Sequence, residues 1–303
     1  MTTNNPLPSE AVRAHLDQVR LLVDADLERL LPSVEEYPET IHKAMRYSVF
    51  AGGKRLRPAL CLEAGRLFGG DEPGLLRLGS ALELIHTYSL IHDDLPALDN
   101  DDLRRGRPTS HCVFGEATAI LAGDALLTLA FEVLSNSSRR APEAKLRLIH
   151  DLAHAIGTRG GMVGGQIIDL EMTGQTADAA TVDYIHSAKT GSFLCAAVRC
   201  GAIYAGASEE DLGRLTTYGK KVGLAFQIVD DLLDVLGSQE QMGKTLGKDV
   251  EQHKATYPAV HGIEPSKQAA RRLIEEGCAA LDPYGEGAQT LVGIAQYLVV
   301  RTS

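Results

Sequence analysis

The sequence lacks tryptophan and has few aromatic residues of any kind. Aromatic residues make up 5% of its 303 residues, whereas hydrophobic residues reach 44%. A core of this size must be built from aliphatic side chains, and the abundance of Ala, Leu, Gly and Glu favours closely packed helices over sheets. No Pro- or Ser-rich linker and no break in composition divides the chain. We therefore expect one large domain over residues 1–303, near the upper limit for a single core.

Other absences exclude whole classes of protein. The five cysteines show neither C-x-x-C pairs nor the spacing of a zinc site, so we expect reduced cysteines that pack inside a cytoplasmic protein. The N-terminus has no basic segment followed by an apolar one, unlike a signal peptide. No charge-free apolar run reaches about 18 residues, which predicts no membrane span. The net charge of −10 argues against nucleic acid as a partner, so an anionic substrate must be attracted locally, by metal ions or a few cationic side chains.

Acidic residues are concentrated in the stretch 86–111. Asp93, Asp94 and Asp99 form a D-D-x-x-x-x-D cluster behind an apolar segment with helical character. Because Pro96 fits poorly inside a helix, the helix should end or bulge there and carry Asp99 back toward the other two carboxylates. Carboxylates this close repel one another unless a cation lies among them, and hard oxygen ligands favour Mg²⁺ or Mn²⁺. The alternative is an acidic helix end in solvent, which explains most runs of like charge.

A second acidic cluster lies in an apolar helical segment far along the chain. In FQIVDDLLDV, Asp230 and Asp234 are one turn apart on the same face, and Asp231 lies between them. Carboxylates among aliphatic residues are expensive to desolvate unless they hold a cation or hydrogen bonds. The two clusters therefore predict two walls of one cavity. Because Mg²⁺ completes its shell with water and substrate phosphates, a phosphate-bearing ligand is implied.

Two segments between these clusters are candidates for close packing around the cavity. The Gly-rich segment 157–172 is not a P-loop, because no G-K-[ST] follows, and its small residues should allow helices to approach. Within it, Gln166 and Asp169 share a face and could reach the cavity. In the helical stretch 181–204, Thr190 and the glycine after it predict a local break that frees backbone carbonyls.

The chain resembles the trans-isoprenyl diphosphate synthases, and most closely the bacterial farnesyl diphosphate synthases. The resemblance rests on the two aspartate motifs together with GGKRLRP (52–58) and KTGSF (189–193), and it extends from about residue 36 to residue 301. It implies an all-α fold, a single large helical bundle of the isoprenoid synthase type with a central cavity, and a homodimer. It also implies Mg²⁺-dependent head-to-tail condensation of isopentenyl diphosphate with dimethylallyl and geranyl diphosphate, giving (2E,6E)-farnesyl diphosphate and pyrophosphate.

The resemblance also implies roles for individual residues. About three Mg²⁺ ions, for which Mn²⁺ can substitute, would be held by carboxylates. These ligands are Asp93, Asp94, Asp99, Asp230 and Asp234, with Asp231 also counted as catalytic. Isopentenyl diphosphate would be bound by Lys54, Arg57, His86 and Arg105. The allylic diphosphate and its cation would be bound by Arg104, Lys189, Thr190 and Gln227, with Lys244 and Lys254 contributed by a polar lid segment.

Tyr88, with Ser89 beside it, marks the expected limit on product length. By the resemblance, an aromatic residue five positions before Asp93 forms the floor of the cavity and stops chain growth at fifteen carbons. The alternative is that Tyr88 is an ordinary core residue, because periodicity alone does not separate the two. Likewise, without the family, Lys189 and the basic turn at 52–58 would be read as solvated surface charges.

Four other functions remain open. A geranyl or geranylgeranyl diphosphate synthase differs only in product length. A class I terpene cyclase would carry an N-D-x-x-S-x-x-x-E second motif and would not need Lys54 and Arg57. A phosphohydrolase could use His92 and Asp93, although no convincing set of further histidine ligands is present. A non-catalytic partner subunit usually loses one acidic cluster, and both are intact here.

Overall fold

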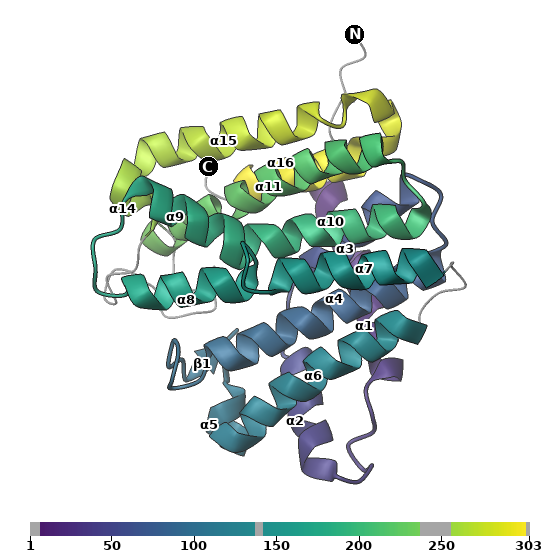
Figure 1. Ribbon diagram of the computed structural model, residues 1–303, viewed down its shortest axis with the longest axis vertical. Coiled ribbons are helices and arrows are strands. Elements are labelled where there is room, and N and C mark those ends of the chain that lie inside the picture. The colour runs from purple at the N-terminus through teal and green to yellow at the C-terminus, as the bar shows by residue number, and fades with distance from the viewer. Residues whose placement is uncertain (1–6, 137–141, 237–255, 301–303) are drawn as a thin grey trace.

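The computed structural model describes residues 7–136, 142–236 and 256–300 and is built almost entirely from helices (Figure 1). The only strands in these ranges are β1 (Leu103–Arg104) and β2 (Arg107–Pro108), which pair as a short antiparallel hairpin. Buried hydrophobic side chains form one cluster that draws on helices from both halves of the chain. The prediction of an all-α fold is therefore confirmed.

The helices follow one another with short connections. The first part of the chain forms α1 (Ser9–Leu30), α2 (Glu39–Val49), α3 (Leu56–Arg66), α4 (Glu72–Asp93), α5 (Ser110–Phe114) and α6 (Glu116–Asn136). The middle forms α7 (Pro142–Ile156), α8 (Met162–Met172), α9 (Ala179–Ile185), the π-helix η1 (His186–Gly191), α10 (Ser192–Ala205) and α11 (Glu209–Leu236). The last part forms α14 (Tyr257–His261), α15 (Ile263–Ala279), the 3₁₀ helix η2 (Asp282–Ala288) and α16 (Gln289–Val300).

Helix α4 is a central element, because it packs against α3, α6 and α10. Asp71 caps its first turn by accepting a 3.1 Å hydrogen bond from the amide of Gly74. Helices α3 and α10 approach almost backbone to backbone: a Cβ added at Gly201 would lie 2.0 Å from the carbonyl oxygen of Cys61. In Figure 1, α10, α11 and α15 lie above α4, whereas α6 lies below it.

The π-helix η1 interrupts the helical stretch where the sequence predicts a break. It is held tightly from two sides by glycines. A Cβ at Gly165 of α8 would lie 2.3 Å from the backbone nitrogen of Lys189, and one at Gly223 of α11 would lie 2.8 Å from the Cα of Gly191. The predicted close approach through small residues is confirmed, and it fixes Lys189 and Thr190 between α8 and α11.

Helix α6 is, among the described helices, the one long and apolar enough to cross a membrane by length and composition. It carries Glu116, Asp124 and Glu132, and 39% of its most apolar window is buried inside the protein. Core helices of soluble proteins pass the same test, so these properties alone do not indicate insertion into a membrane.

Candidate active site

The first aspartate motif lies where α4 ends. Asp93 is the last residue of the helix and Asp94 is its C-cap. The following turn folds back, because the amide of Asp99 donates to the carbonyl of Asp93 at 2.8 Å and the amide of Asp101 donates to that of Asp94 at 3.1 Å. The predicted return of Asp99 toward the helix end is thus confirmed. Burial raises the pKa of the Asp93 carboxyl to about 6; the positive charge of Lys189 opposes this shift and the negative charge of Asp99 adds to it.

Asp94 ties the hairpin to α4. Its side chain is buried, and Oδ1 accepts hydrogen bonds from Nε of Arg104 at 2.9 Å and from Nη2 of the same guanidinium. Asp101 Oδ2 lies 3.4 Å from Nη2. One oxygen of Asp94 is therefore bonded to Arg104. Arg104 is in turn fixed beside the motif.

Lys189 faces the first motif from η1. Its Nζ donates to Asp169 Oδ2 at 2.7 Å, so the candidate acid of α8 does reach the cavity side. Burial by itself would lower the pKa of Lys189, but the charges of Asp93 and Asp169 outweigh it and raise that pKa above the ordinary value. The side-chain oxygen and nitrogen of Gln166 are buried without a hydrogen-bond partner among the described residues. Buried amides are normally bonded, so this one is available to a ligand.

The second aspartate motif lies within α11. Asp230 and Asp234 are half-buried on one face of the helix, whereas Asp231 is buried with 4% of its surface exposed. Asp231 Oδ2 accepts a 2.8 Å hydrogen bond from the amide of Tyr257, the first residue of α14, and lies 3.2 Å from Nε2 of His186. Its Oδ1 accepts a 3.1 Å bond from the side-chain amide of Gln227. Asp231 therefore connects α11 to η1 and to the start of α14.

Gln227 connects this motif to η1. Its side-chain oxygen accepts a 2.8 Å hydrogen bond from the hydroxyl of Thr190, while its nitrogen donates to Asp231. The contact of Thr190 with Gln227 places two predicted allylic-site residues side by side. Lys189 acts electrostatically on Asp93, and Thr190 bonds to Gln227, so η1 links the two acidic clusters.

The basic turn at 52–58 contains both a buried and an exposed cationic side chain. Arg55, in the left-handed conformation at φ 50°, is buried and donates to Asp24 and Glu83, each at 2.8 Å. It is therefore a structural residue that anchors the start of α3. Lys54, its neighbour, is exposed. The turn therefore buries Arg55 and leaves Lys54 exposed.

Arg57, Arg105 and His86 share one electropositive region. The guanidinium of Arg57 lies 4.9 Å from the centre of the Phe193 ring, and burial lowers the pKa of Arg57 to about 10. Arg105 donates to the carbonyl of Gly52, and the neighbouring Gly53 has φ 129°, a conformation that favours glycine. Burial, followed by the charges of Arg57 and Arg105, lowers the pKa of His86 well below the ordinary value.

This region has the character of an anion site. Nε of Arg57 is buried without a hydrogen-bond partner in the described part of the chain. An unsatisfied buried guanidinium N–H costs free energy, which a phosphate oxygen would recover. The carboxylate of Asp230 acts on Arg57 electrostatically, so the second motif and the basic cluster belong to one region.

Tyr88 lies on the wall of α4 close to the first motif. Only 8% of its surface is exposed, and its ring meets that of His92 edge-on at 5.6 Å. Burial raises the pKa of Tyr88 to about 12, and the charge of Asp93 adds to the shift. Ser89 turns its hydroxyl back to the carbonyl of His86 at 2.8 Å. His92 Nε2 lies 3.0 Å from the carbonyl of Ile120, so this nitrogen is engaged with α6.

Some predicted residues lie outside the described part of the chain, and one prediction about the cysteines is wrong. Lys244 and Lys254 lie outside the described residues. The expectation that every cysteine packs in the interior is wrong for Cys112, which is exposed at the start of α5, whereas Cys61, Cys195 and Cys200 are buried. Two hollows of about 1070 Å³ and 690 Å³ lie along α6 and share no lining residue with either aspartate motif.

Sequence reasoning missed the role of His186 and Tyr257, which surround Asp231. The rings of these two residues stack with their centres 6.2 Å apart. The contact from Asp231 to the Tyr257 amide spans 26 residues. No local periodicity could have revealed it, although an aspartate such as Asp231 among aliphatic residues requires a polar partner.

Comparison with known proteins assigns this arrangement to a family. The polyprenyl synthetase family profile matches residues 38–282. The chain is 51% identical to a dimethylallyltranstransferase from Fischerella ambigua, covering 95% of this chain and 83% of the relative. It is 44% identical to a geranylgeranyl diphosphate synthase from Cyanophora paradoxa, covering 95% and 96% of the two chains.

Comparison with solved structures identifies the same family. An FPP/GFPP synthase from Zymomonas mobilis superimposes with a TM-score of 0.86 at 40% identity, covering 96% of this chain and all of the other. A geranyltransferase from Helicobacter pylori, solved with magnesium and isoprenyl diphosphate, superimposes with a TM-score of 0.82 at 30% identity, covering 96% and 97%. The family predicted from the motifs is confirmed. The chain belongs to the polyprenyl synthetase family, whose members are prenyltransferases that act on isoprenyl diphosphates.

Proposed function

We propose that the protein is a Mg²⁺-dependent farnesyl diphosphate synthase. It condenses isopentenyl diphosphate first with dimethylallyl diphosphate and then with the geranyl diphosphate formed. The chain acts as a single domain over residues 1–303, which is supported by the one hydrophobic cluster that draws on both halves. It works as a cytoplasmic homodimer, and the exposed apolar side chains of Ile120 and Leu121 on α6 suit such a partner.

The acidic residues fit Mg²⁺. The donors are carboxylates, the ligand type that Mg²⁺ prefers, and both motifs meet cations of the same region: Asp93 is coupled to Lys189, and Asp230 to Arg57. Burial raises the pKa of the Asp93 carboxyl to about 6, and a bound cation would offset this cost of ionisation. The ions would be held by Asp93, Asp94, Asp99, Asp230 and Asp234. When bound, Mg²⁺ neutralises charge on a diphosphate leaving group.

The protein's own cations complete the binding of the allylic diphosphate. Arg104 and Lys189 are held at the first motif by Asp94 and Asp169, so their charges are already placed when the substrate arrives. Fixed charges of this kind stabilise the negative charge that develops as the C–O bond breaks. Thr190, held by Gln227, adds a polar group beside the developing allylic cation. Lys244 and Lys254 would contribute further contacts to the diphosphate.

The second substrate binds to the electropositive region. Lys54, Arg57, Arg105 and neutral His86 would hold the diphosphate of isopentenyl diphosphate. Its double bond then attacks the allylic cation, and loss of a proton forms the new double bond. No described side chain is an evident base, so the released pyrophosphate is the proposed acceptor of that proton. The apolar wall of α4 excludes water, which would otherwise convert the cation to an alcohol.

The proposal of farnesyl diphosphate as the product rests on the position and burial of Tyr88. Tyr88 is a bulky, buried side chain of α4 within electrostatic reach of Asp93. In the proposed reaction, as the resemblance implies, a growing chain must pass Tyr88 to exceed fifteen carbons. We expect Tyr88→Ala to shift the product to geranylgeranyl diphosphate or longer. Tyr184→Ala, on the exposed face of α9, is the matched control and should leave the product unchanged.

The test is chromatography of the dephosphorylated alcohols from each variant. A Tyr88→Ala enzyme that still makes only farnesyl diphosphate at an unchanged rate would contradict the assigned floor. The rival is a geranylgeranyl diphosphate synthase, favoured by the name of the Cyanophora paradoxa relative. Under that rival the unaltered protein already makes the C20 product.

A further inference from the structure

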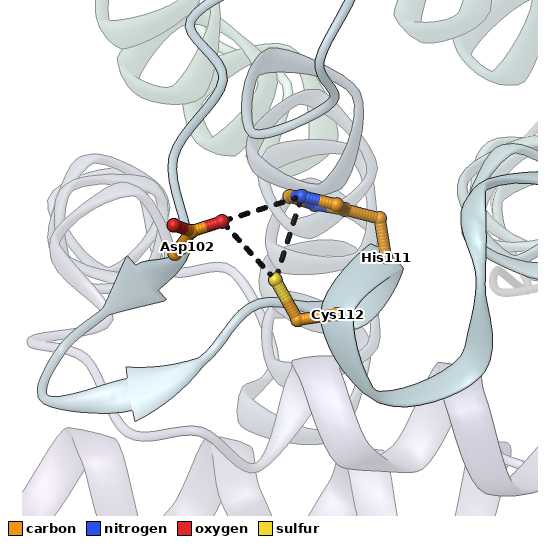
Figure 2. A group of neighbouring side chains, drawn as sticks. All are labelled: Asp102, His111 and Cys112. Atoms are coloured by element: carbon orange, nitrogen blue, oxygen red, sulfur yellow. Dashed lines mark hydrogen bonds and ion pairs between the residues drawn. The ribbon is translucent and has the colours of Figure 1, made fainter.

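A second group of metal-binding side chains lies beside the hairpin. Asp102 directly precedes β1, and the register that pairs Leu103 with Pro108 continues to a 3.0 Å hydrogen bond from the Thr109 amide to the Asp102 carbonyl. The chain then turns into α5, whose first residues include His111 and Cys112. Figure 2 shows the three side chains of Asp102, His111 and Cys112 pointing toward one another.

The three donor atoms are spaced as the corners of a tetrahedral site would be. Sγ of Cys112 lies 3.4 Å from Asp102 Oδ1 and 3.5 Å from His111 Nε2, and the nitrogen lies 4.0 Å from the oxygen. Tetrahedral zinc bonds of about 2.0–2.3 Å place such atoms about 3.3–3.6 Å apart. Two edges already match, and the third must shorten by less than an ångström. The exposed Asp102 carboxylate, with 85% of its side chain accessible, is free to make that movement.

Thr109 supplies an independent feature of a built site. It is buried, and its hydroxyl lies 3.0 Å from Nδ1 of His111 and 3.3 Å from Sγ of Cys112. A hydrogen bond at Nδ1 directs the lone pair of Nε2 toward the other two donors, which is how metal-binding histidines are usually oriented. Only 8% of the His111 side chain is exposed, so the ring has little freedom to turn away.

We infer that Asp102, His111 and Cys112 bind a divalent cation of the zinc type, with the fourth position open to solvent. Thiolate and imidazole ligands select Zn²⁺ over Mg²⁺, whereas the two aspartate motifs offer only oxygen and select Mg²⁺. The protein thus carries two cation sites of different chemistry. The inference does not rest on the proposed reaction, because binding at this site requires no substrate.

The site sits next to residues that contact the first motif. Asp102 is two positions from Arg104, whose guanidinium holds Asp94, and three from Arg105, which holds the carbonyl of Gly52. A cation bound at Asp102 and α5 would cross-link the two sides of the hairpin that carries both arginines. The bound cation would therefore stabilise the hairpin whose arginines, Arg104 and Arg105, are proposed to bind the substrates.

Co²⁺ is the probe that separates this site from the aspartate motifs. The full-length, reduced, metal-free protein is titrated with Co²⁺ in excess Mg²⁺, which occupies the carboxylate sites. We expect a thiolate-to-cobalt charge-transfer band in the near ultraviolet that saturates at one ion per chain and disappears when Zn²⁺ is added. Only a cysteine ligand produces this band, so Co²⁺ held by aspartates alone does not contribute.

Three variants make the test specific. Cys112→Ser should abolish the band, whereas Cys278→Ser, at a half-buried cysteine of α15, should leave it intact. Thr109→Val keeps the shape of the side chain but removes the bond to Nδ1, and it should weaken Co²⁺ binding by about tenfold or more. Far-ultraviolet circular dichroism checks that each variant is folded. Absence of the band in the unaltered protein, or its persistence in Cys112→Ser, would overturn the inference.

Discussion

The first aspartate motif begins at the end of a helix and continues into a turn, whereas the second is helical throughout. In the first, turn hydrogen bonds bring Asp99 back to Asp93 after α4 has ended. In the second, all three aspartates lie inside α11, which ends at Leu236, and helical spacing alone puts Asp230 and Asp234 on one face. Similar sets of carboxylates are therefore presented by a folded loop on one wall and by a rigid helix on the other.

The two motifs nevertheless use their paired aspartates in the same way. The second member of each pair, Asp94 or Asp231, is buried and binds a segment further along the chain. Asp94 holds Arg104 of the hairpin, and Asp231 holds the amide of Tyr257 at the start of α14. The first member of each pair, Asp93 or Asp230, is less buried. We infer that Asp93 and Asp230 are the principal metal ligands of the two pairs, whereas Asp94 and Asp231 mainly position the neighbouring structure.

The largest expected effect comes from removing a first aspartate. Asp93→Ala and Asp230→Ala should each lower kcat by about a thousandfold or more, because each removes charge that the diphosphate-binding centre needs in the transition state. Pyrophosphate release at saturating Mg²⁺ measures this. Asp124→Ala, at an exposed acid of α6, should retain normal turnover. A near-normal rate in either motif variant would refute the assignment.

A smaller effect is expected from the second aspartates. Asp94→Asn and Asp231→Asn should lower kcat/KM by about tenfold to a hundredfold, since they displace neighbouring groups without removing the principal ligands. Asp94 can be tested further with a double-mutant cycle. If it acts through Arg104, Asp94→Asn combined with Arg104→Gln should be little worse than Arg104→Gln alone. Strictly additive losses would mean that Asp94 acts independently of Arg104.

The last effect is expected on stability, and it comes from the glycines that hold η1 between α8 and α11. Gly165→Ala introduces a Cβ 2.3 Å from the Lys189 nitrogen, on the side of the first motif, and Gly223→Ala introduces one 2.8 Å from the Cα of Gly191, on the side of the second. Each should lower the free energy of unfolding by about 1–3 kcal/mol, because backbone must move. Urea denaturation measures the loss.

Gly213→Ala is the matched control for both glycines. It lies in the same helix as Gly223, but its added Cβ would meet nothing within 4 Å. Alanine is the better helix former, so this variant should be neutral or more stable by up to about 1 kcal/mol. If Gly213→Ala destabilised the protein as much as Gly223→Ala, the close contact with η1 would not explain the loss.

Local sequence rules predicted those parts of the site that depend on local backbone geometry. Proline at position 96 predicted the end of α4 and the return of Asp99, and the four-residue spacing predicted a shared face for Asp230 and Asp234. The interruption at Thr190 was also visible, because glycine follows it in an otherwise helical stretch. In each case the physical cause lies within a few residues of its effect.

Features that depend on distant segments were not predicted. In the basic turn Arg55 is buried in a left-handed conformation and Lys54 is exposed, and residue type reveals neither feature. The cluster around Cys112 depends on the register of a hairpin with only two residues in each strand. Likewise, Asp231 meets Tyr257 across 26 residues. Tertiary packing decides all three, and no periodic pattern in the sequence encodes them.

The length of the product made by the unaltered protein tests the central claim most directly. The purified chain is incubated with Mg²⁺, isopentenyl diphosphate and dimethylallyl diphosphate, and the dephosphorylated alcohols are separated by chromatography. Farnesol as the dominant product, formed only when Mg²⁺ is present, is the predicted result. Geranylgeraniol as the dominant product would contradict the assignment of Tyr88 as the floor, and the absence of any prenyl alcohol longer than the starting substrate would contradict the proposed condensation itself.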